Sequence, residues 1–266
     1  MKQIVLQNNW LESWKYSYPY DLMEIYGKTN NFSYAYAYAN RRQHTIELVQ
    51  KVAPPNGKIL DVAGAQGNFS LSLAELGYEV TWNDLRTELI DYIKLKYEYG
   101  VINYAPGNVF ELGFKNEFDV VLITEIIEHV AHPDEFLQKI SQMVKPGGYI
   151  VMSTPNGEYF RNHLPKFSDC ADPSQFEEIQ FKPDGDGHIF LLHQQEIKTL
   201  AKKAGLTVEE IKIVNNFLTN GHLKLRTILK FIPSSWINSF EKLTNLMPFS
   251  FKRKLHNCTI ALLTCS

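Results

Sequence analysis

Three side chains that can act as acids, bases or metal ligands lie together in the stretch TEIIEHV, residues 124–130. Glu125, Glu128 and His129 follow the apolar run DVVLI, so a helix beginning near Glu125 would place all three on one face. Two carboxylates this close repel each other unless a positive group lies between them. The spacing therefore predicts a functional cluster, for which three interpretations are open.

The first interpretation is structural: the glutamates are solvated or cap a helix N-terminus, where negative charge is favoured by ~0.3–1 kcal/mol. This accounts for Glu125 but not for the histidine. In the second, His129 is a general base that takes a proton from a nucleophile, because imidazole titrates near neutral pH. In the third, carboxylates and imidazoles together bind a divalent metal.

Strands and helices alternate around this stretch. Predicted strands are 58–64, 79–84, 118–124 and 149–155, and predicted helices are 67–76, 86–99 and 133–144. A helix at 193–204, a strand near 208–216, a mostly helical insertion near 222–256 and a final strand, CTIALLTC, follow. The alternation indicates an α/β fold: a doubly wound, seven-stranded, mostly parallel sheet that ends in a hairpin. Ligands bind at the carboxyl ends of such strands, so the Glu–His cluster should face a ligand.

The segments outside this alternation are expected to act as lids over the site. Residues 1–50 are rich in aromatic side chains, and YAYAYA alternates as a strand would. The following NRRQHTIELVQKV has helical spacing, so we expect residues 1–50 to form a helical lid. The core then spans residues 51–266, with insertions at about 157–190 and 218–256. Such aromatic lids suit a planar or partly apolar small molecule.

A small-residue loop follows the first strand of the core, in ILDVAGAQGNFSLSLAELG. Asp84 ends the second strand, where a carboxylate can bind both hydroxyls of a ribose. A dinucleotide site is less favoured, because GAQGNF lacks the last glycine of GxGxxG and Asp61 would repel a pyrophosphate. A cationic ligand such as S-adenosylmethionine, with its ammonium and sulfonium, suits Asp61. The alternative is that Asp61 only caps a turn.

Three stretches carry a family resemblance: ILDVAGAQGNFSLSLAELGYEVTWNDL, GNVFELGFKNEFDVVLITEIIEHVAHPDEFLQKISQMVKPGGYIVMSTPN and GHIFLLHQQEIKTLAKKAGLTVEEI. They resemble class I S-adenosylmethionine-dependent methyltransferases, a Rossmann-like family, over roughly residues 55–215. The resemblance implies a methionine end, a ribose site and an adenine site. The implied cofactor-binding residues are Asp61, Gly64 and Gly67 for the methionine end, Asp84 for the ribose, and Asn108 and Val109 for the adenine. Ala63 and Leu85 are implied to bind the cofactor as well.

Two departures from the family pattern bear on this site. Ala63 and Ala65 stand where the family has glycines, which narrows the approach of the cofactor. Asn108 stands where an aspartate commonly meets the adenine amino group. An amide oxygen accepts the same hydrogen bond, so we expect the cofactor still to bind.

The ExxEH pattern, followed by STPNGEYF and a later histidine, is similar to two metal-dependent groups. These are the ubiquinone-biosynthesis O-methyltransferases and the small-RNA 3′-terminal 2′-O-methyltransferases. The resemblance implies Glu125, Glu128, His129 and His188 as ligands of Mg²⁺, Mn²⁺, Zn²⁺ or Fe²⁺, with His129 and Glu125 as catalytic residues. The function that it favours is metal-assisted O-methylation of a small-molecule hydroxyl. Alternatives are a metal-free methyltransferase with His129 as base, an RNA 2′-O-methyltransferase, and a catalytically silent cofactor-binding regulator.

The composition favours a small-molecule acceptor in a reducing compartment. The 266 residues have a formal net charge of −2, so no global field attracts nucleic acid or an acidic membrane. Three widely spaced cysteines form no CxxC pair, which predicts a cytoplasmic protein. No apolar stretch reaches membrane-spanning length, and the N-terminus lacks the pattern of a signal peptide. The basic runs NRRQH and FKRKLH are expected to be solvated faces rather than an RNA-binding surface.

Overall fold

A seven-stranded mixed sheet forms the centre of the protein. The computed structural model describes residues 1–180, 187–217 and 231–265, so parts of both predicted insertions lie outside the described residues. The strands are β1 (Lys58–Val62), β2 (Glu79–Trp82), β3 (Val101–Tyr104), β4 (Phe118–Thr124), β5 (Val144–Pro155), β6 (Leu206–Asn216) and β7 (His256–Cys265). Their order is β3-β2-β1-β4-β5-β7-β6, with β7 antiparallel to both of its neighbours and the other pairs parallel. The predicted fold class is confirmed.

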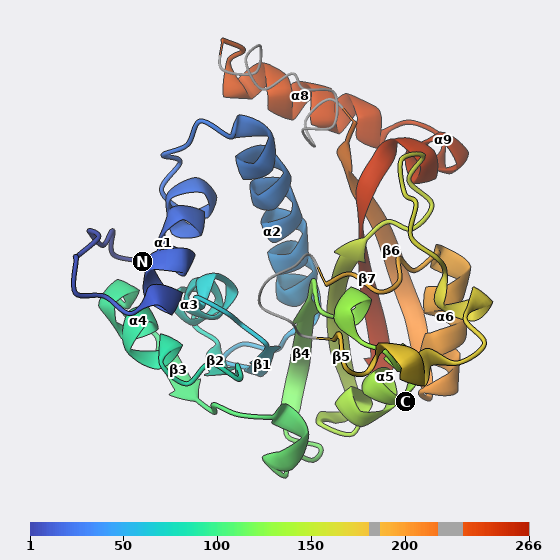
Figure 1. Cartoon of the computed structure of the whole chain (residues 1–266), viewed down its shortest axis with the longest axis horizontal. Helices are drawn as coiled ribbons and strands as arrows, with labels where there is room; N and C mark the ends of the chain where they lie inside the picture. Colours follow the sequence, from blue (N-terminus) through green and yellow to red (C-terminus); the bar gives the residue numbers. More distant parts are fainter. Residues whose placement is uncertain (181–186, 218–230, 266) are drawn as a thin grey trace.

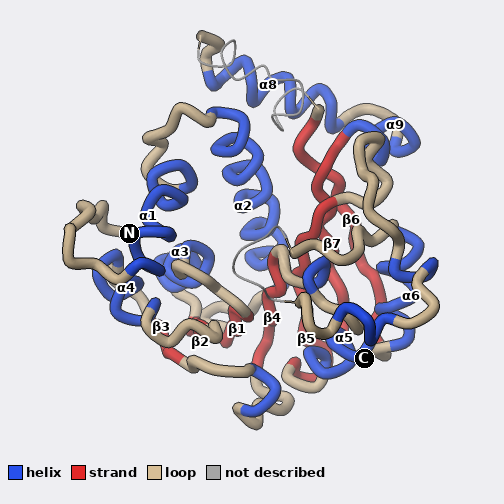
Figure 2. The backbone as a smooth tube through the Cα atoms, in the orientation of Figure 1, coloured by secondary structure: helices blue, strands red, loops and turns tan. Residues whose placement is uncertain are grey.

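Helices cover both faces of this sheet (Figure 1, Figure 2). The described helices are α1 (Glu12–Glu24), α2 (Phe32–Val52), α3 (Asn68–Glu75), α4 (Leu89–Lys96), α5 (Pro133–Ser141), α6 (Gln194–Lys203), α8 (Ser234–Asn245) and α9 (Phe249–Leu255). Side chains of β4 point alternately to the two faces, as the pleat requires. Val120 and Leu122 join the core under α2 and α3, whereas Val121 and Ile123 join the core under α5 and α6. None of the helices in the described ranges is long and apolar enough to cross a membrane.

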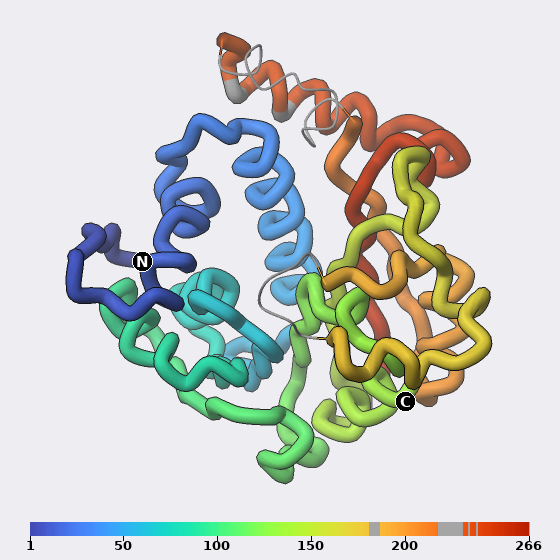
Figure 3. Tube along the Cα trace, in the orientation of Figure 1, coloured from blue at the N-terminus to red at the C-terminus, as the bar shows by residue number. Residues whose placement is uncertain are grey.

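The N-terminal segment adopts the predicted helices. The YAYAYA run lies inside α2 and does not form a strand. Tyr38 of this run is buried, as are Leu48 and Val49 later in the same helix, which is the spacing of one buried helical face. Helix α1 is anchored by a fully buried ion pair in which Lys96 Nζ of α4 lies 2.9 Å from Asp21 Oδ2. The first residues of the chain run alongside α4 (Figure 3), where the Lys2 amide donates to the Lys96 carbonyl. These contacts hold α1 over the edge of the sheet where β1 and β2 end.

One strand of the sheet, β3, was not predicted from the sequence. β3 is four residues long and lies at the edge of the sheet, paired only with β2 among the described strands. Its side chains alternate between exposed and half-buried, so VINY has neither the length nor the apolar character that marks β1 and β4. The sequence of such an edge strand shows only a weak strand pattern, because strand formation there depends on pairing with the neighbouring strand.

Candidate functional site

The loop between β1 and α3 has a backbone that normally requires glycine. Ala63, Ala65 and Gly67 have positive φ values of 50°, 47° and 75°. Gly64 lies so close to β2 that a Cβ there would be 2.7 Å from Trp82 Cδ1. The Gly64 amide also donates to the Asn83 carbonyl at 2.8 Å. The loop therefore packs tightly against β2, and its two alanines are held in a conformation that costs an L-residue roughly 1–2 kcal/mol.

We expect Ala65→Gly to stabilise the fold. Removing the left-handed strain outweighs the extra chain entropy of glycine in the unfolded state, so the free energy of unfolding should rise by about 0.5–1 kcal/mol. Urea denaturation of the ligand-free protein measures it. The matched control is Ala39→Gly, at an exposed position inside α2, which should lower stability by about 1 kcal/mol. Equal losses in the two variants would show that the left-handed conformation of Ala65 carries no strain.

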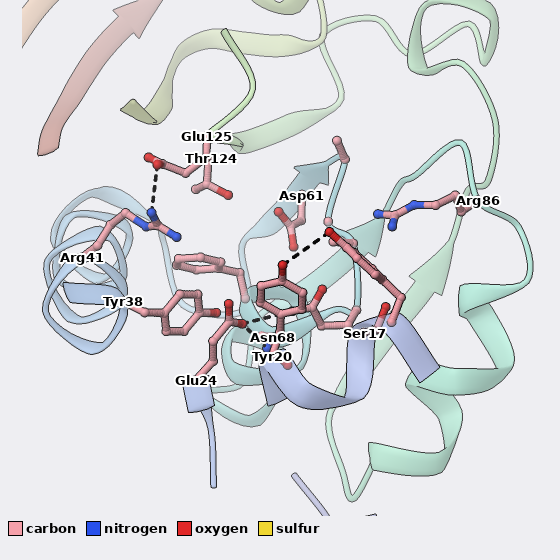
Figure 4. A pocket seen from close by; sticks show the side chains of 16 residues that line it. Ser17, Tyr20, Glu24, Tyr38, Arg41, Asp61, Asn68, Arg86, Thr124 and Glu125 are labelled. Atoms are coloured by element: carbon pink, nitrogen blue, oxygen red, sulfur yellow. Dashed lines mark hydrogen bonds and ion pairs between the residues drawn. The ribbon is translucent and has the colours of Figure 1, made fainter. Parts of the chain in front are cut away.

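Asp61 is a buried carboxylate with half of its hydrogen-bonding capacity unused. Ser70 Oγ donates to Oδ2 at 2.5 Å, and Oδ1 has no partner within the described part of the chain. Burial raises the pKa of Asp61 to about 6. The side chain lines a cavity of about 350 Å³ together with Ala63 and Gly64, which we call the Asp61 cavity. Figure 4 shows Asp61 in the middle of it, between Arg41 at one end and Arg86 at the other. An unpartnered carboxylate in a cavity favours a cationic ligand.

A second cavity, of about 470 Å³, adjoins the first at Ala63, which lines both. We call it the Asp84 cavity. Four more of the residues predicted to bind the cofactor line it: Asp84, Leu85, Asn108 and Val109. Gly67 lines neither of the two cavities; it is the N-cap of α3. Seven of the eight predicted cofactor residues thus lie along one continuous site.

The Asp84 carboxylate is already hydrogen-bonded within the protein. It accepts from the Ala65 amide at 2.9 Å and from Arg86 Nε and Nη2 at 3.0 Å each. The amide bond ties the β1–α3 loop to the end of β2. A ribose bound here would have to share Asp84 with Arg86 or displace the guanidinium, whose side chain is 43% exposed and therefore able to move.

The stretch after β4 is not the predicted helix. Glu125 has a φ of 55°, and only a short 3₁₀ turn, Ile127–His129, follows it. The left-handed residue breaks the helical spacing, so the expectation of three side chains on one helical face is wrong. The Glu125 carboxylate accepts from Ser153 Oγ at 2.8 Å and lies 2.8 Å from Arg41 Nη1. The cation that relieves repulsion at Glu125 is thus an arginine of α2.

Three of the four predicted metal ligands lie together. The possible ligand atoms of Glu128, His129 and His188 all lie within 4.8 Å of one another, and the two imidazole centroids are 4.7 Å apart. His188 is brought here because the amide of Ile189 donates to the Glu128 carbonyl at 2.7 Å. Glu125 is outside this group, which we call the Glu128 cluster.

Glu128 resembles Asp61 in its environment. It is fully buried; Thr154 Oγ1 donates to Oε2 at 3.0 Å, and Oε1 has no partner in the described ranges. Burial raises the pKa of Glu128 well above its usual range, and the nearby charge of Glu125 raises it further. An orphaned carboxylate oxygen beside two imidazoles is a donor set that fits a divalent cation.

Helices α1 and α2 contribute side chains to the site that were not predicted from the sequence. Arg41 belongs to the run NRRQH, which was expected to be solvated, yet its side chain is only 19% exposed and lines the Asp61 cavity. Glu24 of α1 lines the same cavity and accepts from Tyr34 Oη, Gln66 Nε2 and Asn68 Nδ2 at 2.6–3.0 Å. The available signal was helical spacing, because Tyr34, Tyr38 and Arg41 follow one another at steps of four and three.

The fold and the site define a class of protein. A mostly parallel seven-stranded sheet carries Asp61 near the end of β1, a tight loop after that strand and Asp84 after β2, and two adjoining cavities lie beside these residues. A family model described as methyltransferase domain matches residues 35–211, which is most of the chain. The chain therefore belongs to the methyltransferase domain family, which confirms the predicted family resemblance.

Individual relatives agree with this assignment. A stretch of 122 residues is 41% identical to the ubiquinone biosynthesis O-methyltransferase of Colwellia psychrerythraea, covering 43% of this chain and 50% of that protein. The chain thus spans about half the length of the curated relative it matches. A solved S-adenosylmethionine-dependent methyltransferase from Mesorhizobium loti has a TM-score of 0.52 at 15% identity, covering 82% of this chain and 96% of that one.

A second solved structure extends the likeness in fold. It is Haemonchus contortus phosphoethanolamine N-methyltransferase 2 in complex with S-adenosyl-L-methionine, with a TM-score of 0.52 at 18% identity. The match covers 92% of this chain and 59% of that one. Because both solved structures are distant in sequence, they support the fold and leave the acceptor to be inferred from the site.

Proposed function

We propose that this protein transfers the methyl group of S-adenosylmethionine to a hydroxyl of a small molecule, with a divalent metal at the Glu128 cluster. The observation that carries the proposal is the pair of adjoining cavities. The unpartnered Asp61 carboxylate lies in one cavity and suits a cationic methionine end, and Asp84 lies in the other and suits a ribose. Their junction at Ala63 supports a single extended ligand.

The reaction itself requires little covalent chemistry from the protein. S-adenosylmethionine, when bound, supplies an electrophilic methyl group on a sulfonium. The acceptor oxygen forms a bond to that carbon as the carbon–sulfur bond breaks, the bonding electron pair remains on sulfur, and the hydroxyl proton leaves. The protein must align the oxygen, exclude water and receive the proton. Thr124 and Glu125, at the end of β4, line the Asp61 cavity where this alignment would occur.

Glu128, His129 and His188 are the residues that would hold the metal. A divalent cation there would lower the pKa of a coordinated hydroxyl and so ease loss of its proton. Glu125 would join only if its ion pair with Arg41 opened, so we assign it to the acceptor side of the site. In the competing proposal, His129 of the same cluster is the base and no metal is bound. The two proposals differ in whether a chelator should stop methyl transfer.

Calorimetry with S-adenosylhomocysteine tests the cofactor assignment. We expect saturable binding to the purified protein, and we expect Asp84→Ala to weaken it by ~1–3 kcal/mol through lost hydrogen bonds to the ribose. Asp91→Ala, which removes an exposed carboxylate of α4, is the matched control and should bind normally. Tight binding of NAD with no heat from S-adenosylhomocysteine would overturn the proposed function.

A further inference from the structure

A third cavity, of about 390 Å³, lies on the other side of the Arg41–Glu125 ion pair. Tyr38, Arg41 and Glu125 line both this cavity and the Asp61 cavity, so the ion pair forms a common wall. The remaining lining comes from the start of α2 and from the ends of β5, β6 and β7. We call it the Asn257 cavity. Its volume is within the range of small-molecule sites, and it adjoins the place where the methyl group would be presented.

The lining of the Asn257 cavity carries no net charge. Arg41 and Glu125 neutralise each other at 2.8 Å, and no other lining residue is basic or acidic. Burial raises the pKa of the Tyr34 and Tyr38 phenols and of the Cys258 thiol, so these groups are neutral near pH 7. A phosphate or carboxylate on an acceptor would meet no unpaired cation among the lining residues. The cavity therefore selects against charged acceptors.

The same lining is rich in groups that hydrogen-bond to hydroxyls. Its uncharged side chains that carry a hydroxyl or an amide are Asn31, Ser33, Tyr34, Tyr38, Asn215 and Asn257. Ser33 is 2% exposed and its Oγ has no partner in the described structure. Asn257 is half-buried, and its Oδ1 atom is buried and also has no partner among the described residues. A buried polar atom left unpaired is costly by ~1–3 kcal/mol, so these two atoms are candidates for pairing with a ligand. Amides and hydroxyls both donate and accept, which matches the hydroxyl group.

Aromatic rings complete the cavity. The rings of Tyr34 and Tyr38 are stacked, with centroids 6.4 Å apart and planes 21° apart, and the Arg41 guanidinium lies 5.3 Å from the centre of the Tyr38 ring. The flat aromatic faces can contact the C–H groups of a ligand, while the neighbouring amides can hydrogen-bond to its hydroxyls. A hydrocarbon chain would instead leave Ser33 Oγ and Asn257 Oδ1 unpaired.

From these observations we infer that the acceptor is a neutral polyhydroxylated molecule, such as a glycosyl unit, bound in the Asn257 cavity. This inference rests on the proposed function, because it names the acceptor of the same reaction. One hydroxyl of the acceptor would point past Arg41 and Glu125 toward the Asp61 cavity. Its oxygen forms a bond to the methyl carbon, its proton passes to the Glu125 carboxylate that lines both cavities, and sulfur keeps the electron pair of the broken carbon–sulfur bond, so the transfer is balanced.

The test compares methyl glycosides with an apolar phenol. Wild-type protein saturated with S-adenosylhomocysteine is examined by saturation-transfer NMR against methyl hexopyranosides, a disaccharide, a hexose phosphate and a prenylated catechol. The protein with S-adenosylmethionine is then assayed for S-adenosylhomocysteine release with the same four probes. We expect binding and turnover with a neutral glycoside, and weaker binding of the hexose phosphate and the catechol.

Two variants localise the acceptor. Asn257→Leu and Ser33→Val should each lower kcat/KM for the glycoside by about 5- to 20-fold, because each removes a hydrogen bond to a substrate hydroxyl. Neither should change the affinity for S-adenosylhomocysteine. Asn103→Leu, a matched polar-to-apolar change on β3 at the opposite edge of the sheet, should leave both quantities unchanged. Circular dichroism identifies a variant that fails to fold. In that case the kcat/KM of the other variant tests whether the acceptor binds in the Asn257 cavity.

Two outcomes would overturn the inference while the proposed function stands: no glycoside binds to the S-adenosylhomocysteine complex, or the catechol alone is methylated. Unchanged kcat/KM for a glycoside in both folded variants would place the acceptor elsewhere and also overturn it. Failure of the proposed function is recognised separately, because S-adenosylhomocysteine would then not bind at all.

Discussion

Methyl transfer is expected to stop when divalent metal is removed with EDTA, while S-adenosylhomocysteine still binds with nearly the same affinity. The physical reason is that the Glu128 cluster is distinct from the Asp61 and Asp84 cavities: none of its three residues lines either of them. Adding back Mg²⁺, Mn²⁺ or Zn²⁺ should restore turnover. It should also stabilise the fold by about 2.7 kcal/mol at a hundredfold excess over Kd, a readout independent of activity.

Glu128→Gln should mimic the chelator. It keeps the shape of the side chain and removes the buried charge, so turnover should fall at least 100-fold by analogy with other metal-site losses. The metal-induced rise in melting temperature should disappear as well. Glu12→Gln, at a glutamate whose side chain is 90% exposed and which lines none of the three cavities, is the control. Full activity in excess EDTA, combined with an inactive His129→Ala, would support the metal-free base and rule out the metal.

The second large effect is expected at Asp61, where stability and binding should change in opposite directions. Asp61→Asn removes a buried and half-unpaired charge, so the ligand-free protein at pH 7 should be more stable by on the order of 1–2 kcal/mol. The same change should weaken S-adenosylmethionine binding by about 10- to 100-fold, because the cationic end of the ligand loses its counter-charge. Thermal melts and calorimetry on one preparation measure both.

The pH dependence gives an independent check on Asp61. Its pKa in the folded protein, about 6, is above the ordinary value of 3.8, so the ligand-free fold binds this proton more readily than the unfolded chain does. The contribution of Asp61 to the free energy of unfolding should therefore increase as pH falls from about 6 to about 4. Cofactor affinity should decrease over the same interval, as the carboxylate is neutralised.

Asp61→Asn should remove the part of both pH dependences that arises from this carboxylate. Asp91→Asn, at an exposed aspartate of α4, should leave them as in the wild type. If cofactor affinity in wild type is constant from pH 7 to pH 5, Asp61 does not contact the cationic end of the ligand.

The strands and the cofactor loop could be predicted from the sequence because they follow from local patterns. β4 is continuously apolar because both of its faces are buried, and this pattern is visible in DVVLI without any knowledge of its neighbours. Asp61 and Asp84 each end or nearly end a strand, and parallel strands bring their carboxyl ends to one edge of the sheet. Seven of the eight residues predicted to bind the cofactor therefore line two adjoining cavities. β3 was missed because its side chains are only partly buried.

The tertiary structure alone decided which groups meet across the site. Arg41 and Glu125 are far apart in the chain, and no local pattern indicates that a basic run on α2 will neutralise a carboxylate after β4. Glu125 itself has a left-handed backbone conformation, and this turns its side chain away from the Glu128 cluster. Glu125 therefore lies on the acceptor side of the site. The Asn257 cavity likewise exists only because α2 packs across the ends of β5, β6 and β7. Helix and strand periodicity specifies which faces are buried, whereas the pairing of buried polar groups depends on how the elements pack together.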